Sequence, residues 1–170
     1  IGEPLPVDGE NVRLYRSGLL CDELINAGHD VIWWSSSFDH SLKMLRTCGD
    51  TVELSGNSKI LLLNASPYKK NISIKRIVNH ILLARDFRKK ISNEVTPDII
   101  LCSFPIIELC RDAVKYANDK SIPIIIDVRD LWPDIFLDLL PKWLKAIVKV
   151  LIFKMFSDTN YLFRHASSIT

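Results

Sequence analysis

The stretch "SIPIIIDVRDLWPD", residues 121–134, carries the clearest signal of the fold. Its first half is an apolar run typical of a strand that is buried on both faces, as in a parallel sheet. Its second half places three acids and an arginine, with Trp132 and Pro133, in the segment that leaves this strand. In an open α/β sheet, ligands bind outside the carboxyl ends of the strands. We therefore expect this charged exit loop to form part of a site.

Helices and strands are expected to alternate before and after this stretch. The sequence predicts a helix from about Asn11 that ends at Gly28, a strand at 31–35, two strands joined by a turn at Gly56–Asn57, a helix at 74–91, a strand at 98–103, a helix from Ser103 and Pro105 to about Asp119, a strand at 122–128, a helix from about Lys142 to Phe156, and the start of a strand in "ASSIT". This alternation indicates an α/β fold with a doubly wound, mostly parallel, Rossmann-like sheet.

Residues 1–170 are expected to form one Rossmann-like domain of a longer protein. The first helix is preceded by the loop "IGEPLPVDGE", whereas a doubly wound sheet normally begins with a strand. We therefore expect the first strand to lie upstream of residue 1. No apolar run in the sequence is long enough to span a bilayer.

The composition excludes some classes of protein. With 48% apolar and 25% charged residues the chain is globular, and a net charge of only +2 argues against a nucleic-acid partner. The four cysteines contain no C-x-x-C pair, and Cys21, Cys102 and Cys110 lie in apolar stretches, so we expect buried thiols there rather than metal ligands or redox groups.

The first candidate site is the start of the first helix. Gly9 ends a Gly/Pro loop, and Arg13 and Arg16 are expected in the first turns of the helix, on one face. Cations there oppose the helix dipole, which makes sense if the free amides and the guanidinium groups bind an anion. The alternative is a solvated surface pair with Glu10 as a partner.

The second candidate site follows the strand that contains Trp33 and Trp34. Adjacent strand residues point to opposite faces, so at least one tryptophan should belong to the core. The polar loop after the strand contains His40, which could serve a site, and Lys43, which would suit a phosphate. The alternative is an ordinary surface or capped histidine.

The third candidate site is the exit loop of the opening stretch. Asp127 or Asp130 could act as a base or hold sugar hydroxyls, with Arg129 between them. The exit loop "SFPIIE", residues 103–108, is expected to line the same cleft. In the alternative reading, Arg129 pairs with one aspartate, Asp130 caps a turn, and the tryptophan and proline that follow only pack.

The fourth candidate surface is the lysine-rich segment "LPKWLKAIVKVLIFKMF". Lysines including Lys145 and Lys149 gather on one side of a helix whose other side is bulky and apolar, with Trp143 near its start. This pattern indicates a helix in a membrane interface, although an amphipathic helix that covers the sheet would look similar. The basic helix at 74–91 would add attraction to anionic lipid.

The motifs "GEPLP", "GENVRLYRSGLL", "AGHDVIWWSSSFDHSLK" and "DVRDLWPD" together resemble the N-terminal half of bacterial family-4 glycosyltransferases. The resemblance covers nearly the whole chain. It implies a retaining enzyme of the GT-B fold, with two Rossmann-like domains, that takes part in O-antigen or capsule assembly. The N-terminal domain of such enzymes holds the acceptor, often a sugar on a polyprenyl diphosphate. The C-terminal domain holds a nucleotide sugar, commonly UDP-linked. Its E-x(7)-E acidic pair is absent here, so this chain resembles only the acceptor half.

The resemblance also implies roles for the candidate residues. Asp130 would orient or deprotonate the acceptor hydroxyl, supported by Asp127 and Arg129. Arg13 and Arg16 would meet phosphate, and the loop with His40 and Lys43 would bind the acceptor. No metal or other cofactor is implied, and the protein would act peripherally on the cytoplasmic face of the inner membrane.

Two other readings stay open. The chain could be a non-catalytic, membrane-associated Rossmann-like binding domain. It could also be another doubly wound protein, such as a nucleotide-binding or receiver domain, although the G-x-G-x-x-G fingerprint of dinucleotide binding is absent.

Overall fold

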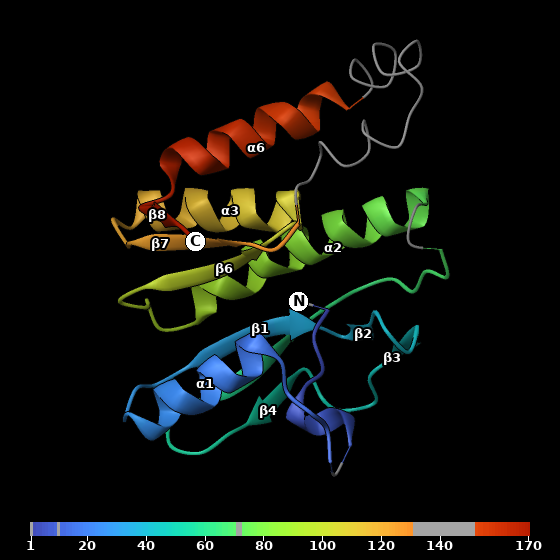
Figure 1. Ribbon diagram of the computed structural model, residues 1–170, viewed down its shortest axis with the longest axis vertical. Helices are drawn as coiled ribbons and strands as arrows, with labels where there is room; N and C mark the ends of the chain where they lie inside the picture. The colour runs from blue at the N-terminus through green and yellow to red at the C-terminus, as the bar shows by residue number, and fades with distance from the viewer. Residues whose placement is uncertain (1, 10, 71–72, 131–151) are drawn as a thin grey trace. The chain divides into compact units, whose positions relative to one another are not determined.

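The computed structural model describes residues 2–9, 11–70, 73–130 and 152–170 (Figure 1). The chain divides into two compact units, Ile1–Phe87 and Arg88–Thr170. Both units combine helices with at least one parallel pair of strands, so the predicted mixed α/β class is confirmed. Each unit is described by itself below.

The first unit contains a mixed sheet in which, among the described residues, the strand order is β1-β5-β4. Strand β1 (Ile32–Ser36) pairs in parallel with β5 (Lys59–Leu63), and β5 pairs antiparallel with β4 (Thr51–Glu53). The predicted turn between β4 and β5 is confirmed, and Gly56 in it has a φ of +68°, which glycine adopts without strain. The first strand begins one residue later than predicted.

The two tryptophans of β1 contact different parts of the first unit. Trp33 packs against the cluster of Leu5, Ile60 and Leu62. Trp34 instead meets the ring of Phe87 edge-on, with 5.2 Å between the ring centres. The prediction that the two side chains point to opposite faces of the strand is therefore confirmed.

Helix α1 (Arg16–Asn26) ends as predicted but begins later. At its end the amide of His29 donates to the carbonyl oxygen of Leu24, and Gly28, with a φ of +86°, donates to Ile25. This is the bonding of a Schellman cap. The predicted start at Asn11 is wrong, because residues 11–15 are not helical and Tyr15 has an extended conformation.

Helix α2 (Ile74–Lys90) follows the first sheet and leads into a 3-10 turn, η2 (Ile91–Asn93). Its range agrees with the prediction to within one residue, but most of the apolar residues that give the helical period do not lie on its buried face. The apolar side chains at Ile77, Val78, Ile81 and Leu82 are exposed, whereas the buried positions are Asn79, His80, Leu83, Ala84 and Phe87. A side-chain hydrogen bond helps to explain why Asn79 is buried. The side-chain amide nitrogen of Asn79 donates to the backbone carbonyl oxygen of Ser66 at 2.6 Å, which holds this side of the helix against the protein.

Two further strands form a small antiparallel hairpin in place of the expected polar loop. They are β2 (Phe38–Asp39) and β3 (Met44–Leu45). Figure 1 shows them beyond the carboxyl end of β1. The N-terminal loop contains a 3-10 turn, η1 (Pro6–Asp8).

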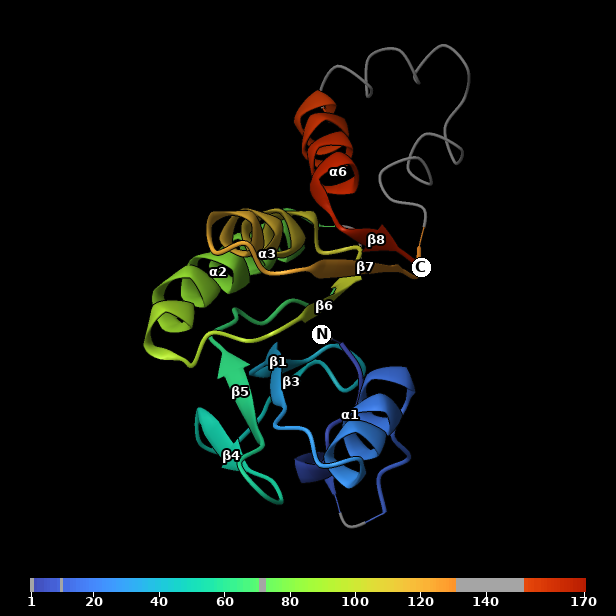
Figure 2. The same cartoon turned by 90° about the vertical axis from the view of Figure 1, so that its left-hand side faces the viewer.

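The second unit contains a parallel sheet, with the order β6-β7-β8 in the part that the structure describes. The strands are β6 (Ile100–Phe104), β7 (Ile124–Val128) and β8 (Ser168–Ile169), so the strand expected in "ASSIT" is confirmed. Helix α3 (Ile107–Asp119) packs against β6, β7 and α6 (Phe153–His165). Figure 2 shows both helices on the same side of this sheet.

The last predicted helix is corrected at one end. The sequence places its end near Phe156, but α6 continues to His165, and its Leu162 is fully buried. Positions 142–151 of the prediction lie outside the described residues. In the described ranges, no helix has both the length and the apolar character needed to cross a membrane.

Candidate functional site

The chain segments that leave β1 and β5 lie together at one edge of the first sheet. Because the two strands are parallel, their carboxyl ends meet at the same edge. The amide of Ser37 donates to the carbonyl oxygen of Leu63, and the amide of Ala65 donates to the Ser37 hydroxyl. These bonds hold the exit of β1, which leads to His40, beside the exit of β5, which leads to Tyr68.

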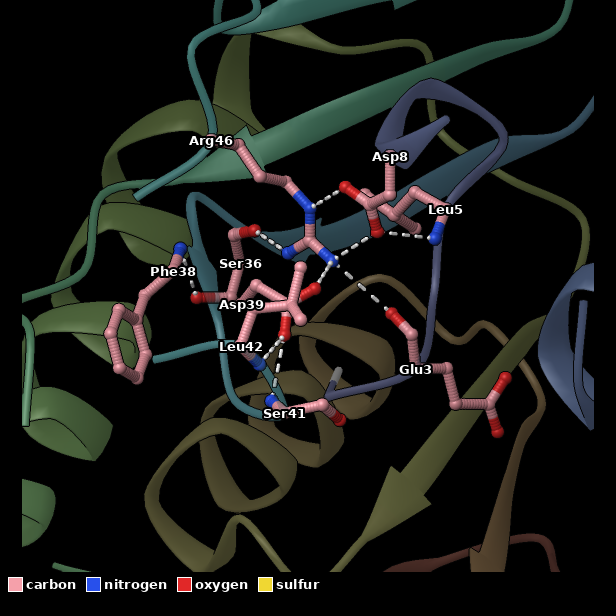
Figure 3. A network of polar contacts seen from close by, with 9 residues as sticks. All are labelled: Glu3, Leu5, Asp8, Ser36, Phe38, Asp39, Ser41, Leu42 and Arg46. Carbon is pink, nitrogen blue, oxygen red and sulfur yellow. Dashed lines mark hydrogen bonds and ion pairs between the residues drawn. The ribbon is translucent and has the colours of Figure 1, made fainter. Parts of the chain in front are cut away.

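The β2–β3 hairpin is held by the guanidinium group of Arg46 (Figure 3). Arg46 donates to both carboxylate oxygens of Asp8 at 2.6 and 2.7 Å, to Asp39 at 3.2 Å, and to the carbonyl oxygen of Ser36 at 2.7 Å. Its side chain is only 4% exposed. Burial raises the pKa of Asp8, but the bonds from Arg46 and the Leu5 amide outweigh burial, so the pKa is lowered.

The turn of the hairpin directs Lys43 back toward the protein. The carboxylate of Asp39 accepts the amides of Ser41 and Leu42 at 2.7 and 2.8 Å (Figure 3), which closes a tight turn. Lys43 follows with a φ of +58°, a conformation that lysine rarely adopts. Its Nζ lies 4.9 Å from the centre of the Tyr68 ring. Such strain is often found where a fold positions a functional side chain.

His40, Lys43 and Tyr68 form the centre of the candidate site. The Nδ1 atom of His40 lies 2.6 Å from the Tyr68 hydroxyl and 3.3 Å from the Lys43 Nζ. Since an ammonium group can only donate, Nδ1 is the acceptor, and the neutral imidazole carries its proton on Nε2. Gly2, with a φ of +90°, lies beside His40, because a Cβ at Gly2 would be 4.0 Å from that of His40.

Positive charge from helix α2 converges on this centre. Burial, Lys43 and Arg76 lower the pKa of His40, and burial and Arg76 also lower that of Lys43. Burial, followed by the charges of Arg76 and His40, lowers the pKa of His80 to about 4. Asp39 opposes these effects at His40 and Lys43, but it is already bonded to Arg46 and to two amides of the turn. The site therefore combines two cations that repel each other, Lys43 and Arg76, with the neutral imidazole of His40, which can donate a hydrogen bond. Binding of an anion such as a phosphate would stabilise this arrangement.

The predicted site at the start of helix α1 has a different geometry from the one expected. Arg13 is exposed and lies three residues before the helix, and Arg16 is the first helical residue, so the prediction that both lie in the first turns is wrong. The backbone amide of Ser17 donates a hydrogen bond to the carboxylate of Glu3 at 2.9 Å. An acid of the chain itself thus occupies one of the first-turn amides that the prediction assigned to an external anion. Gly9 is exposed and ends η1.

The exit of β7 in the second unit contains an ion pair. Arg129 Nε donates to the buried carboxylate of Asp127 at 2.8 Å, as in the alternative reading of this loop. Ser103 lies beside Asp127 in the register of β6 and β7, so the predicted exit loop at 103–108 begins within the strand. In helix α3, burial raises the pKa of Glu108. Asp130 is exposed. Among the described residues of the β7 exit, its carboxylate is thus the one presented to solvent.

Some predicted residues lie outside the described part of the chain. They are the membrane-contact candidates Trp143, Lys145 and Lys149, and the loop residues Trp132 and Pro133. Cys21, Cys102 and Cys110 are buried, as predicted, and the Sγ atoms of the last two lie 3.4 Å apart. Within the described residues, no three His, Cys, Asp or Glu side chains are grouped so as to hold a metal ion.

Sequence reasoning found His40 and Lys43 but missed Tyr68, Arg76 and His80. A usable signal is present for Tyr68, since it follows an apolar strand that the sequence predicts correctly. In the sequence, Arg76 and His80 stand out only as members of a basic helix.

Comparison with known proteins identifies no family for the chain. No protein-family model matches it, and no match was found among curated proteins.

Proposed function

We propose that the chain is the acceptor-binding half of a retaining glycosyltransferase. The enzyme would move a sugar from a nucleotide sugar, in the first instance a UDP-sugar, to a saccharide on a polyprenyl diphosphate during bacterial O-antigen or capsule assembly. The convergence of His40, Lys43 and Arg76 at the carboxyl edge of β1 and β5 carries the proposal. The quoted motifs support it, and so do the parallel strand pairs, which fit a Rossmann-like, doubly wound sheet.

In this proposal the cluster binds the diphosphate of the acceptor. Lys43 and Arg76 supply charge to phosphate oxygens, and His40 donates from Nε2, since its Nδ1 is already an acceptor. The nucleotide sugar is held by a second Rossmann-like domain. The enzyme works peripherally on the cytoplasmic face of the inner membrane, where the acceptor is found.

Binding of a short prenyl diphosphate tests this assignment. The variant Lys43→Asn removes the charge, and asparagine tolerates the positive φ of this position. We expect it to weaken binding of geranyl diphosphate about tenfold, the loss of one charge-assisted contact. Isothermal titration calorimetry measures this affinity.

The matched control is Lys120→Asn, which makes the same charge change at an exposed position of the second unit. It should bind like the unsubstituted protein. Equal weakening in both variants, or no binding to the unsubstituted protein, would remove the diphosphate role from the cluster.

The exposed Asp130 is the residue of the β7 exit that we propose to orient the acceptor hydroxyl, while Asp127 and Arg129 hold the loop. Asp130→Asn in the full-length protein should lower turnover by at least about tenfold without changing donor affinity. Release of UDP with a polyprenyl-diphosphate-linked saccharide measures turnover. Asp98→Asn, at another exposed aspartate, serves as the control. Unchanged turnover of Asp130→Asn would exclude this role.

The second candidate function is a non-catalytic, membrane-associated binding domain. The bond between Asp127 and Arg129 favours it, because this pairing gives the loop a structural reason for its charges. The turnover assay separates the two functions. Diphosphate binding without transfer from any UDP-sugar would favour the binding domain.

A further inference from the structure

The β2–β3 hairpin presents apolar side chains to solvent in an unusual density. Leu42, Met44 and Leu45 are 65%, 64% and 49% exposed. They flank Lys43 in the turn and in the strand after it. Exposed single leucines are normal on protein surfaces, whereas three large apolar residues within four positions at the tip of one hairpin indicate an interaction surface.

This exposure comes from the fold of the hairpin and not from loose packing. Asp39 closes the turn through two backbone amides, and the buried Arg46 ties the base of the hairpin to Asp8 and to the end of β1 (Figure 3). The positive φ of Lys43 directs the charged side chain toward His40. The tip therefore offers its apolar residues outward, although the turn contains a lysine.

Basic side chains follow the residue that packs against this hairpin. Tyr68 packs against Phe38 and His40 of the hairpin, with ring centres 4.8 and 5.8 Å apart. The exposed Lys69 and Lys70 follow Tyr68 directly. Asp39, the acid of the hairpin, is bonded to Arg46. The surface thus combines apolar residues that can insert with cations that attract negative charge, which is the chemistry of an anionic lipid bilayer.

We propose that the β2–β3 hairpin is a membrane-docking element, in which Leu42, Met44 and Leu45 insert into the interface of a bilayer containing anionic lipid while Lys69 and Lys70 contact its headgroups. This surface is separate in sequence from the lysine-rich segment around residues 142–154. Docking through this surface does not depend on sugar transfer. The docking residues lie on the outward side of the hairpin, whereas Lys43 and His40 form the cluster on its inward side.

Sedimentation with lipid vesicles tests the proposal on the full chain. The double variant Leu42→Ser/Met44→Ser should bind vesicles of phosphatidylcholine with phosphatidylglycerol at least about tenfold more weakly. The double variant Lys69→Gln/Lys70→Gln should lose about tenfold on the same vesicles, and this loss should shrink in high salt. The control is Val95→Ser/Ile99→Ser, which removes two exposed apolar side chains elsewhere and should bind normally.

Two further measurements distinguish a loss of docking from misfolding and from a loss of the diphosphate site. Circular dichroism should show the same secondary structure in all variants, and the Leu42→Ser/Met44→Ser protein should keep its affinity for inorganic pyrophosphate. Vesicle binding of Leu42→Ser/Met44→Ser at the unsubstituted level would overturn the proposal. So would a self-association of the chain that this variant abolishes while vesicle binding persists, because the patch would then be a protein interface.

Discussion

Arg46→Leu is expected to lower the free energy of unfolding by about 3–5 kcal/mol, the range for removing one partner from a buried charge network. The guanidinium group is 4% exposed and bonds two carboxylates from distant segments, Asp8 and Asp39, as well as the backbone of Ser36. Without it both acids would be left largely buried and without their cation, and the β2–β3 hairpin would lose its attachment to the N-terminal loop. Urea denaturation followed by circular dichroism measures the loss.

Two controls make the Arg46 experiment specific. Arg46→Lys keeps the charge but cannot form the forked bond to Asp8. Its free energy of unfolding should therefore lie between those of Arg46→Leu and the unsubstituted protein. Lys154→Ala breaks an exposed pair with Asp158 and should cost no more than about 0.5 kcal/mol. A loss below about 1 kcal/mol for Arg46→Leu would mean that the two acids are solvated and that the network contributes little.

Acidification from about pH 7 to about pH 5 is expected to reduce the free energy of unfolding by about 2 kcal/mol through His80 alone. His80 is 6% exposed, and burial with the charges of Arg76 and His40 lowers its pKa from 6.5 to about 4. Between these values the unfolded chain binds a proton that the folded chain does not. The stability due to His80 is therefore complete above about pH 6.5 and is lost as the pH falls.

The difference between two proteins isolates the contribution of His80. In His80→Gln the slope of stability against pH between about pH 5 and about pH 7 should be markedly smaller, as measured by denaturation at each pH. His40, whose pKa is also lowered, adds a slope of the same sign, whereas the raised pKa of Glu108 acts in the opposite sense. Both remain in the variant. Identical slopes in the two proteins would show that the pKa of His80 is the same in the folded and the unfolded chain.

A bound anion should change this pH dependence. Since a phosphate near His40 and His80 favours their protonated forms, a saturating diphosphate should reduce the acid-induced loss of stability. The pH dependence of stability therefore also reports on the proposed function, because a diphosphate bound far from the two histidines would not change their pKa values.

The local elements of the fold can be predicted from the sequence alone. Apolar runs predict β5, β6 and β7, the period of a helix predicts α2 and α3, and Gly28 and the Gly56 turn are recognised from residues within a few positions. His40 and Lys43 are also found, because a polar loop after an apolar strand is a local pattern. These features depend on backbone preferences and on side-chain period, which a short window of sequence contains.

Which side chains meet depends on the tertiary structure. Tyr68 reaches His40 because β1 and β5 pair in parallel across an interval of the chain that no local pattern spans. The buried face of α2 contains Asn79 and His80, and the loop after β5 supplies the carbonyl oxygen of Ser66 as a hydrogen-bond acceptor for Asn79. Likewise, Glu3 accepts the Ser17 amide at the start of α1 from fourteen residues away. Such contacts are set by the pairing of distant segments, and their energies are therefore absent from any single stretch of the sequence.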